Sequence, residues 1–134
     1  IIHLKRDARA TCWSNFKHFF SSKDNGYSLD YVDLANFYKS YRNLMDFWHE
    51  LYPNKIYDLD YESLTLDQES ETRKLLEYCD LDWDQNCLKF YENNRAVRTP
   101  SSSQVRKKMY QGSSVVWKKY SSHIQPLISA LEKY

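Results

Sequence analysis

An arginine and a serine near the start of the chain have the types and the spacing of a phosphate-binding pair. Arg6 follows an apolar run, and Ser14 lies eight positions later in a segment with helical character. A guanidinium and a hydroxyl placed in this way can both donate hydrogen bonds to one phosphate. On the spacing alone, the alternative stays open that Arg6 pairs with a carboxylate such as Asp7 and that Ser14 is an ordinary surface serine.

The elements around this pair predict where it lies in the fold. Residues 1–5 are expected to form a buried strand, and a helix is expected from about Ala8 to Phe20. Arg6 then stands where a parallel strand ends. Because ligands bind at the carboxyl ends of the strands in open α/β sheets, this is an edge typical of binding sites.

Hydrophobic periodicity predicts an α/β pattern for the rest of the chain. A long amphipathic helix is expected over about 29–51. A short strand over 55–59 is expected to return to the same parallel sheet and to run into a loop at 60–64. We interpret the aromatic stripe of the long helix as core rather than as a binding surface. Asp67 is a suitable N-cap for a third helix over about 67–79. Shorter helical segments are expected near 84–91, 104–110, 113–120 and 122–134.

Composition and charge fit a single folded domain with one basic region. The chain has 134 residues, of which 42% are hydrophobic and 16% aromatic, and this suffices for a core. The net charge of +1 hides an asymmetry, because residues 58–84 are rich in carboxylates whereas residues 93–131 have none. Helix caps and first turns account for much of the acidic run. The basic stretch indicates a surface that meets a polyanion, with a solvated basic face as the alternative.

The cysteines and histidines show no pattern of a metal site. Cys12, Cys79 and Cys87 lack CxxC spacing, and we expect reduced thiols, as in a cytosolic protein. The four histidines show neither HxxxH spacing nor a pairing with an acid and a nucleophile that would indicate hydrolysis. We therefore assign no metal ligand and no catalytic base. No apolar run approaches the length of about 20 residues that spans a membrane, and no signal peptide is recognisable.

Several separated blocks match one protein family in the same order. They are KRDARATCWSNF, GYSLDYVDLANFYKSYRNLMDFW, YDLDYESL, CDLDWDQNCLKFY, and RTPSSSQVRKKMY followed by VVWKKY. Together they resemble the sulfotransferases that use 3'-phosphoadenosine 5'-phosphosulfate (PAPS). The resemblance is greatest to the bacterial sulfotransferase domains often joined to tetratricopeptide repeats, which are related to the tyrosylprotein and heparan sulfotransferases. It implies a P-loop-NTPase-like α/β fold, present in part, with short parallel strands in predominantly helical surroundings.

The resemblance also implies roles for individual residues. Arg6 and Ser14 would hold the 3'-phosphate of the cofactor. Tyr61 would lie against the adenine or the adjoining sugar-phosphate, and Ser101 would come near the bridging oxygen or the 5'-side phosphate. From the residues alone, Tyr61 can equally be a core or strand-edge tyrosine, and Ser101 can be a helix N-cap.

One position departs from the family's pattern. The family often places a basic residue directly before the tryptophan of its last motif, where this residue helps to hold phosphate. Val116 stands there in this chain. We expect Arg106 to supply the charge instead, with Lys107 and Lys118 as alternatives.

The parts of the family that lie upstream of these blocks are not seen in the chain. These parts are the general base and the loop that wraps the 5'-phosphosulfate. No GxxxxGK[ST] pattern occurs in the chain. We therefore expect residues 1–134 to be the C-terminal part of a single sulfotransferase domain, inactive alone. The complete enzyme would transfer a sulfuryl group from PAPS to an acceptor hydroxyl or amine and release adenosine 3',5'-bisphosphate.

Two other functions and several acceptors stay open at this stage. The chain can be a non-catalytic module that binds a polyanion or nucleic acid, or a P-loop kinase relative that binds ATP, but neither accounts for the ordered blocks. The acceptor can be a peptide tyrosine, a sugar or a small metabolite. We expect no nucleic-acid partner, tetratricopeptide repeats in the full-length protein, and a cytoplasmic location, or the Golgi lumen for a eukaryotic relative with an upstream anchor.

Overall fold

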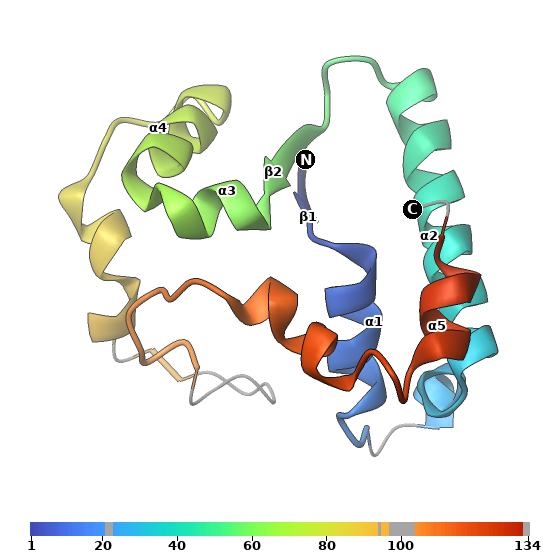
Figure 1. Cartoon of the computed structure of the whole chain (residues 1–134). Helices are drawn as coiled ribbons and strands as arrows, with labels where there is room; N and C mark the ends of the chain where they lie inside the picture. The colour runs from blue at the N-terminus through green and yellow to red at the C-terminus, as the bar shows by residue number, and fades with distance from the viewer. Residues whose placement is uncertain (21–22, 94, 97–103, 133–134) are drawn as a thin grey trace.

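The structure is a computed structural model that describes residues 1–20, 23–93, 95–96 and 104–132. It has a mixed α/β layout, mostly helical with one short parallel sheet, as the sequence predicts (Figure 1). The strands β1 (Ile2–Lys5) and β2 (Tyr57–Asp60) pair with Lys5 opposite Asp60. Because the strands are parallel, the chain leaves both of them at the same edge. Arg6 and Tyr61 are the first residues beyond that edge.

The first helix, α1 (Ala8–Phe16), begins at Asp7 and ends earlier than predicted. The Asp7 carboxylate accepts a hydrogen bond of 2.8 Å from the backbone N–H of Ala10. Lys17 is the C-cap, so the expectation of a helix reaching Phe20 is wrong by one turn. Phe19 is 82% exposed. A longer helix would gain little burial there, and helices in proteins are stabilised mostly by packing.

The long helix α2 (Tyr31–Leu51) agrees closely with the prediction, but its aromatic stripe is only half core. Asp30 caps its first turn, accepting hydrogen bonds from two backbone N–H groups. In the first half of the helix Leu34 and Tyr38 are buried against α1 and the C-terminal region. In the second half the stripe is exposed, because no described segment covers it. The exposed members there are Leu44, Trp48 and Leu51, and Phe37 in the first half is exposed as well.

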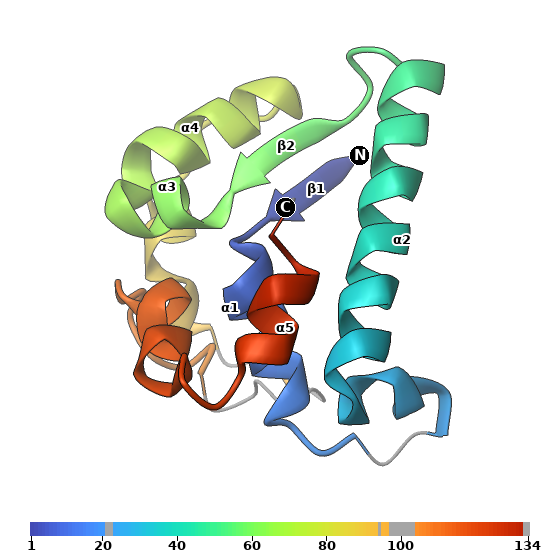
Figure 2. The ribbon, with the colours of Figure 1, turned by 45° about the vertical axis from the view of Figure 1, so that its right-hand side comes forward.

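Acidic caps organise the segment after β2. The loop expected there is a short helix, α3 (Tyr61–Leu66), whose N-cap Asp60 accepts a 2.8 Å hydrogen bond from the Ser63 N–H. Asp67 then caps α4 (Gln68–Tyr78), as predicted. A 3₁₀ segment, η2 (Gln85–Glu92), follows its own aspartate cap. Both views place α3 and α4 on the opposite side of the strand pair from α2 (Figures 1 and 2).

The C-terminal region closes the core against α1 and α2. Its elements are η3 (Ser113–Tyr120), a 3₁₀ segment at the predicted place, and α5 (Gln125–Ala130), which is shorter than the helix expected over 122–134. The helix expected over 104–110 is only a turn. A further 3₁₀ segment, η1 (Lys23–Leu29), precedes α2. The core joins α1, α2, η3 and α5, and its least exposed side chains include Cys12, Leu34, Ile124, Leu127 and Leu131.

The cysteines and the apolar character of the helices were also considered from the sequence. All three cysteines are free thiols, and Cys12 is buried in the core. Within the part of the chain that the structure describes, none of the helices has both the length and the apolar character needed to cross a membrane.

Candidate functional site

A polar cleft of about 270 Å³ lies between α1, the first residue of α3 and the segment 104–116. We call it the Arg6 cleft. Two cationic side chains line it, Arg6 and Lys17, together with hydroxyl, amide and aromatic groups. No carboxylate is found among the described residues that line it. Such a lining favours an anionic ligand, because positive charge and hydrogen-bond donors have no competing acid.

Arg6 is held in place by two contacts that leave most of its donors available. Its Nε donates to Ser114 Oγ at 3.1 Å, and its guanidinium carbon lies 4.8 Å from the centre of the Tyr61 ring. A guanidinium carries five N–H donors. The two terminal nitrogens have no hydrogen-bond partner among the described residues. They can therefore bind a second, external acceptor in a fork geometry.

Ser14 and Lys17 present a hydroxyl and an ammonium from α1 to the same cleft. Ser14 is half-buried and lies on the helix, and Lys17 follows it by one turn at the C-cap. Residues three apart on a helix are neighbours, so both reach one side of α1. The Ser14 hydroxyl has no hydrogen-bond partner within the described segments.

Tyr61 closes the cleft from the other side through a contact with η3. Its hydroxyl lies 2.9 Å from Ser113 Oγ. Ser113 is placed by Gly112, the N-cap of η3, whose φ of +88° lies in the left-handed region. A side chain there would meet open space, so the constraint is the backbone angle, which glycine adopts without strain. Gly112 thus allows the turn that brings Ser113 to Tyr61.

The structure brings three of the five predicted binding residues together. Arg6, Ser14 and Tyr61 all line the Arg6 cleft. Arg106 does not line it, because its exposed side chain donates a 2.6 Å hydrogen bond to the backbone carbonyl of another residue. Ser101 lies outside the described residues.

Sequence reasoning missed the second cation of the cleft. Val116, where the family pattern has a basic residue, does line the cleft. The positive charge near it comes from Lys17, on a different element. A signal was present, since Lys17 follows Ser14 by three positions within the expected helix and is therefore its neighbour on the helix surface.

The fold and the cleft define the class of the protein. It is an α/β protein with a carboxylate-free, cationic cleft at the edge where two parallel strands end, within the described residues. Residues 1–85 match the model of the sulfotransferase family. This match contains Arg6, Ser14 and Tyr61. The chain belongs to the sulfotransferase family, as its ordered sequence blocks predict.

A bacterial relative extends the similarity over nearly the whole chain. An uncharacterized protein of Aquifex aeolicus (strain VF5) is 36% identical over 135 residues, which cover 99% of this chain. The aligned part is 18% of that protein, so the chain spans less than a fifth of the length of this relative. The similarity therefore includes the segment 104–116 of the Arg6 cleft, which the family match does not reach.

Proposed function

We propose that this chain is the C-terminal part of a sulfotransferase domain with a P-loop-NTPase-like fold, and that it binds the 3'-phosphate side of PAPS. One observation carries the proposal. Arg6, Ser14 and Tyr61, three of the residues to which the family resemblance gives nucleotide contacts, line one carboxylate-free cleft although they come from three different parts of the chain.

The residues of the cleft fit one end of a nucleotide. The terminal nitrogens of Arg6 and the hydroxyl of Ser14 are donors for 3'-phosphate oxygens, and Lys17 adds a positive charge. The Tyr61 ring offers a flat face to the adenine or the ribose. The cleft of about 270 Å³ is slightly smaller than a typical small-molecule site of about 300–1,000 Å³. This size agrees with a site for part of the cofactor.

The proposed reaction is an in-line group transfer. When bound, PAPS supplies a sulfuryl group whose bond to the bridging phosphate oxygen breaks as a bond from sulfur to an acceptor oxygen or nitrogen forms. The acceptor loses its proton to a base, and adenosine 3',5'-bisphosphate leaves. The task of this chain is positioning, since Arg6 and Ser14 fix one end of the nucleotide so that its other end is correctly aimed. We propose that the base and the loop around the 5' side lie upstream, so the chain alone is inactive.

Ligand preference tests the proposal against its alternatives. The whole protein that carries this chain is titrated with adenosine 3',5'-bisphosphate, adenosine 5'-monophosphate and ATP at two salt concentrations. We expect the 3',5'-bisphosphate to bind most tightly at both. Equal affinities for adenosine 3',5'-bisphosphate and adenosine 5'-monophosphate, with a steep loss of both affinities at high salt, would instead indicate a polyanion-binding module. Preference for ATP would indicate a kinase relative.

A further inference from the structure

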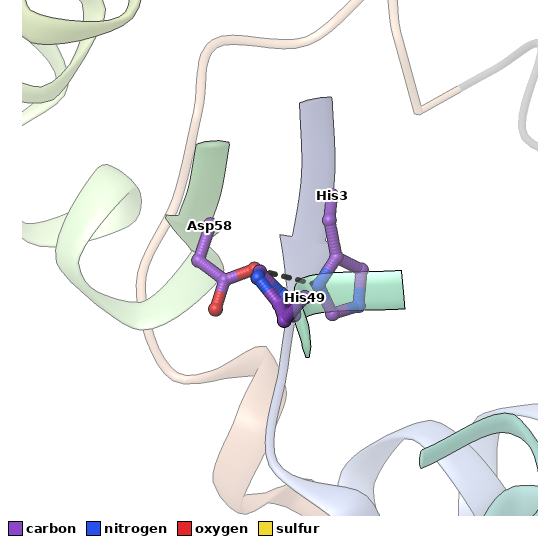
Figure 3. A group of neighbouring side chains, drawn as sticks. All are labelled: His3, His49 and Asp58. Carbon is purple, nitrogen blue, oxygen red and sulfur yellow. Dashed lines mark hydrogen bonds and ion pairs between the residues drawn. The ribbon is translucent and has the colours of Figure 1, made fainter. Parts of the chain in front are cut away.

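Two histidines and one aspartate meet on the face of the strand pair that α2 covers, away from the Arg6 cleft. His3 lies in the middle of β1, Asp58 is its register partner on β2, and His49 lies in the last turn of α2. Figure 3 shows the three side chains pointing toward one another from these elements. The Asp58 Oδ1 accepts hydrogen bonds from His3 Nδ1 at 2.7 Å and from His49 Nε2 at 3.1 Å. The spacing of the histidines along the chain does not predict this pairing.

The three ligand atoms are close to the spacing of a zinc site. Each residue offers one ligand atom, and these atoms lie within 4.8 Å of one another. In a tetrahedral site with bonds of about 2.0–2.2 Å, neighbouring ligand atoms lie about 3.3–3.5 Å apart. The two hydrogen-bonded separations therefore need to widen by less than about 1 Å, and the separation between the two histidine nitrogens, which is at most 4.8 Å, needs to narrow by up to about 1.5 Å. Two imidazoles and one carboxylate are a ligand set that Zn²⁺ prefers.

A second contact already orients one of the imidazoles. The other ring nitrogen of His3, Nε2, is hydrogen-bonded to the hydroxyl of Tyr41 on α2. Metal-binding histidines almost always use their second nitrogen for a hydrogen bond that holds the ring. At His3 a bound ion would replace the Nδ1 proton that points to Asp58, and Nε2–H would then donate to the Tyr41 hydroxyl. Side-chain exposure falls from 35% for His49 and Asp58 to 9% for His3. An ion could thus enter from the surface, where it meets His49 and Asp58, and bind His3 as the buried ligand.

Lys5 is the nearby group that opposes a cation. Its Nζ lies 3.4 Å from Asp58 Oδ2, and its side chain is 38% exposed. Burial alone would raise the pKa of the Asp58 carboxyl, but the hydrogen bond from His3 and the Lys5 ammonium together hold it below its ordinary value. Because Lys5 is partly exposed, its ammonium can move into solvent when an ion occupies the site.

We propose that His3, His49 and Asp58 form a binding site for a divalent transition metal ion of the Zn²⁺ type, with water completing its coordination. The bound ion joins the end of α2 to both strands. Since β1 leads directly to Arg6 and β2 leads directly to Tyr61, the ion fixes the two strands that deliver these residues to the cleft. This role is structural, and it does not depend on the reaction that the protein catalyses.

Zinc titration of the metal-stripped protein tests the site. The protein is treated with a chelator, dialysed and titrated with Zn²⁺ by calorimetry. We expect one ion per chain at micromolar concentrations, and a loss of affinity of at least about tenfold in both His49→Ala and Asp58→Asn. His49 is the first variant because its side chain is partly exposed and at a helix end, so the fold tolerates its loss. His123→Ala, which removes an exposed histidine elsewhere, is the matched control.

Two further measurements distinguish this site from other zinc ligands. Lys5→Met should tighten Zn²⁺ binding, because the variant removes a cation beside Asp58. Co²⁺ bound in place of Zn²⁺ should show visible d–d bands with no thiolate charge-transfer band, since no cysteine is a ligand. Absence of stoichiometric binding, equal loss in His123→Ala, weaker binding in Lys5→Met or a thiolate band would each overturn the proposal.

Discussion

The guanidinium carbon of Arg6 lies 4.8 Å from the centre of the Tyr61 ring, so the residues that follow the two parallel strands are in contact. The contact depends on the sheet. Lys5 and Asp60 are register partners, and the next residue of each strand leaves at the same edge. The ring supports one side of the guanidinium through a cation–π interaction, and Arg6 lines the Arg6 cleft with its terminal nitrogens unpaired within the described residues.

Removing the Arg6 side chain should weaken binding of adenosine 3',5'-bisphosphate by about 2 to 5 kcal/mol, the cost of losing one partner of a buried, charged hydrogen-bonded pair. Arg6→Lys should fall between wild type and Arg6→Ala, because an ammonium keeps the charge but loses the fork. Calorimetry measures both. Arg73→Ala, which removes an exposed arginine paired with Glu69 on α4, is the control. Unchanged affinity in Arg6→Ala would remove Arg6 from the site.

The ring of Tyr61 should matter more than its hydroxyl. Tyr61→Phe loses the hydrogen bond to Ser113 and should cost about 0.5–1.5 kcal/mol of folding stability, with little effect on nucleotide affinity. Tyr61→Ala also loses the flat face and should weaken nucleotide binding by about 1–3 kcal/mol. Thermal unfolding and nucleotide titration of the two variants separate these effects. Equal nucleotide affinities of the two variants would argue against a contact between Tyr61 and the adenine or the ribose.

Lys17 should contribute a modest, salt-sensitive part of the affinity. Its side chain is exposed at the end of α1, so Lys17→Ala should weaken bisphosphate binding by about 1 kcal/mol at low salt. The difference should shrink at high salt, because exposed charges are screened. Lys119→Ala, on the exposed part of η3 and outside the cleft lining, should have no comparable effect. A similar loss in both variants would indicate general electrostatic attraction rather than a site at Lys17.

Cys12 should be unreactive in the folded protein and should lower stability at alkaline pH. Burial, reinforced by the nearby Asp7 carboxylate, raises the pKa of the Cys12 thiol to about 12. Because the unfolded chain releases this proton near pH 9 and the folded chain keeps it, stability falls by up to about 1.4 kcal/mol per pH unit above pH 9. Denaturant unfolding at pH 8 and pH 10.5, in wild type and in Cys12→Ala, isolates this contribution. Alkylation at pH 8 should label Cys79 and Cys87 before Cys12, and faster labelling of Cys12 would contradict its burial.

Much of the fold is predictable because its signals are local. Each signal is carried by residues close in sequence to the element that it predicts. Examples are the periodicity of α2, the alternation of elements around β1 and β2, and the cap at Asp67. The errors have tertiary causes. The exposed second half of the α2 stripe shows that periodicity identifies an apolar face but not what covers it. The missed helix α3 begins directly at the end of β2, where the Asp60 cap was interpreted as part of a strand and loop.

The candidate site was predictable only in part, for the same reason. The family resemblance named Arg6, Ser14 and Tyr61, and these three line one cleft. Lys17 and the turn at Gly112 complete the cleft through packing of η3 on α1, which no local pattern encodes. The pairing of His3 with Asp58 depends on strand register. His3 and Asp58 lie far apart in the sequence, so their pairing cannot be predicted until the register of β1 and β2 is known.

The most direct test of the central claim is a crystal structure of the whole protein with adenosine 3',5'-bisphosphate bound. We expect the 3'-phosphate within hydrogen-bond distance of the Arg6 terminal nitrogens and the Ser14 hydroxyl, with the nucleoside beside Tyr61. A 3'-phosphate bound elsewhere, with Arg6 and Ser14 not in contact with the nucleotide, would contradict it.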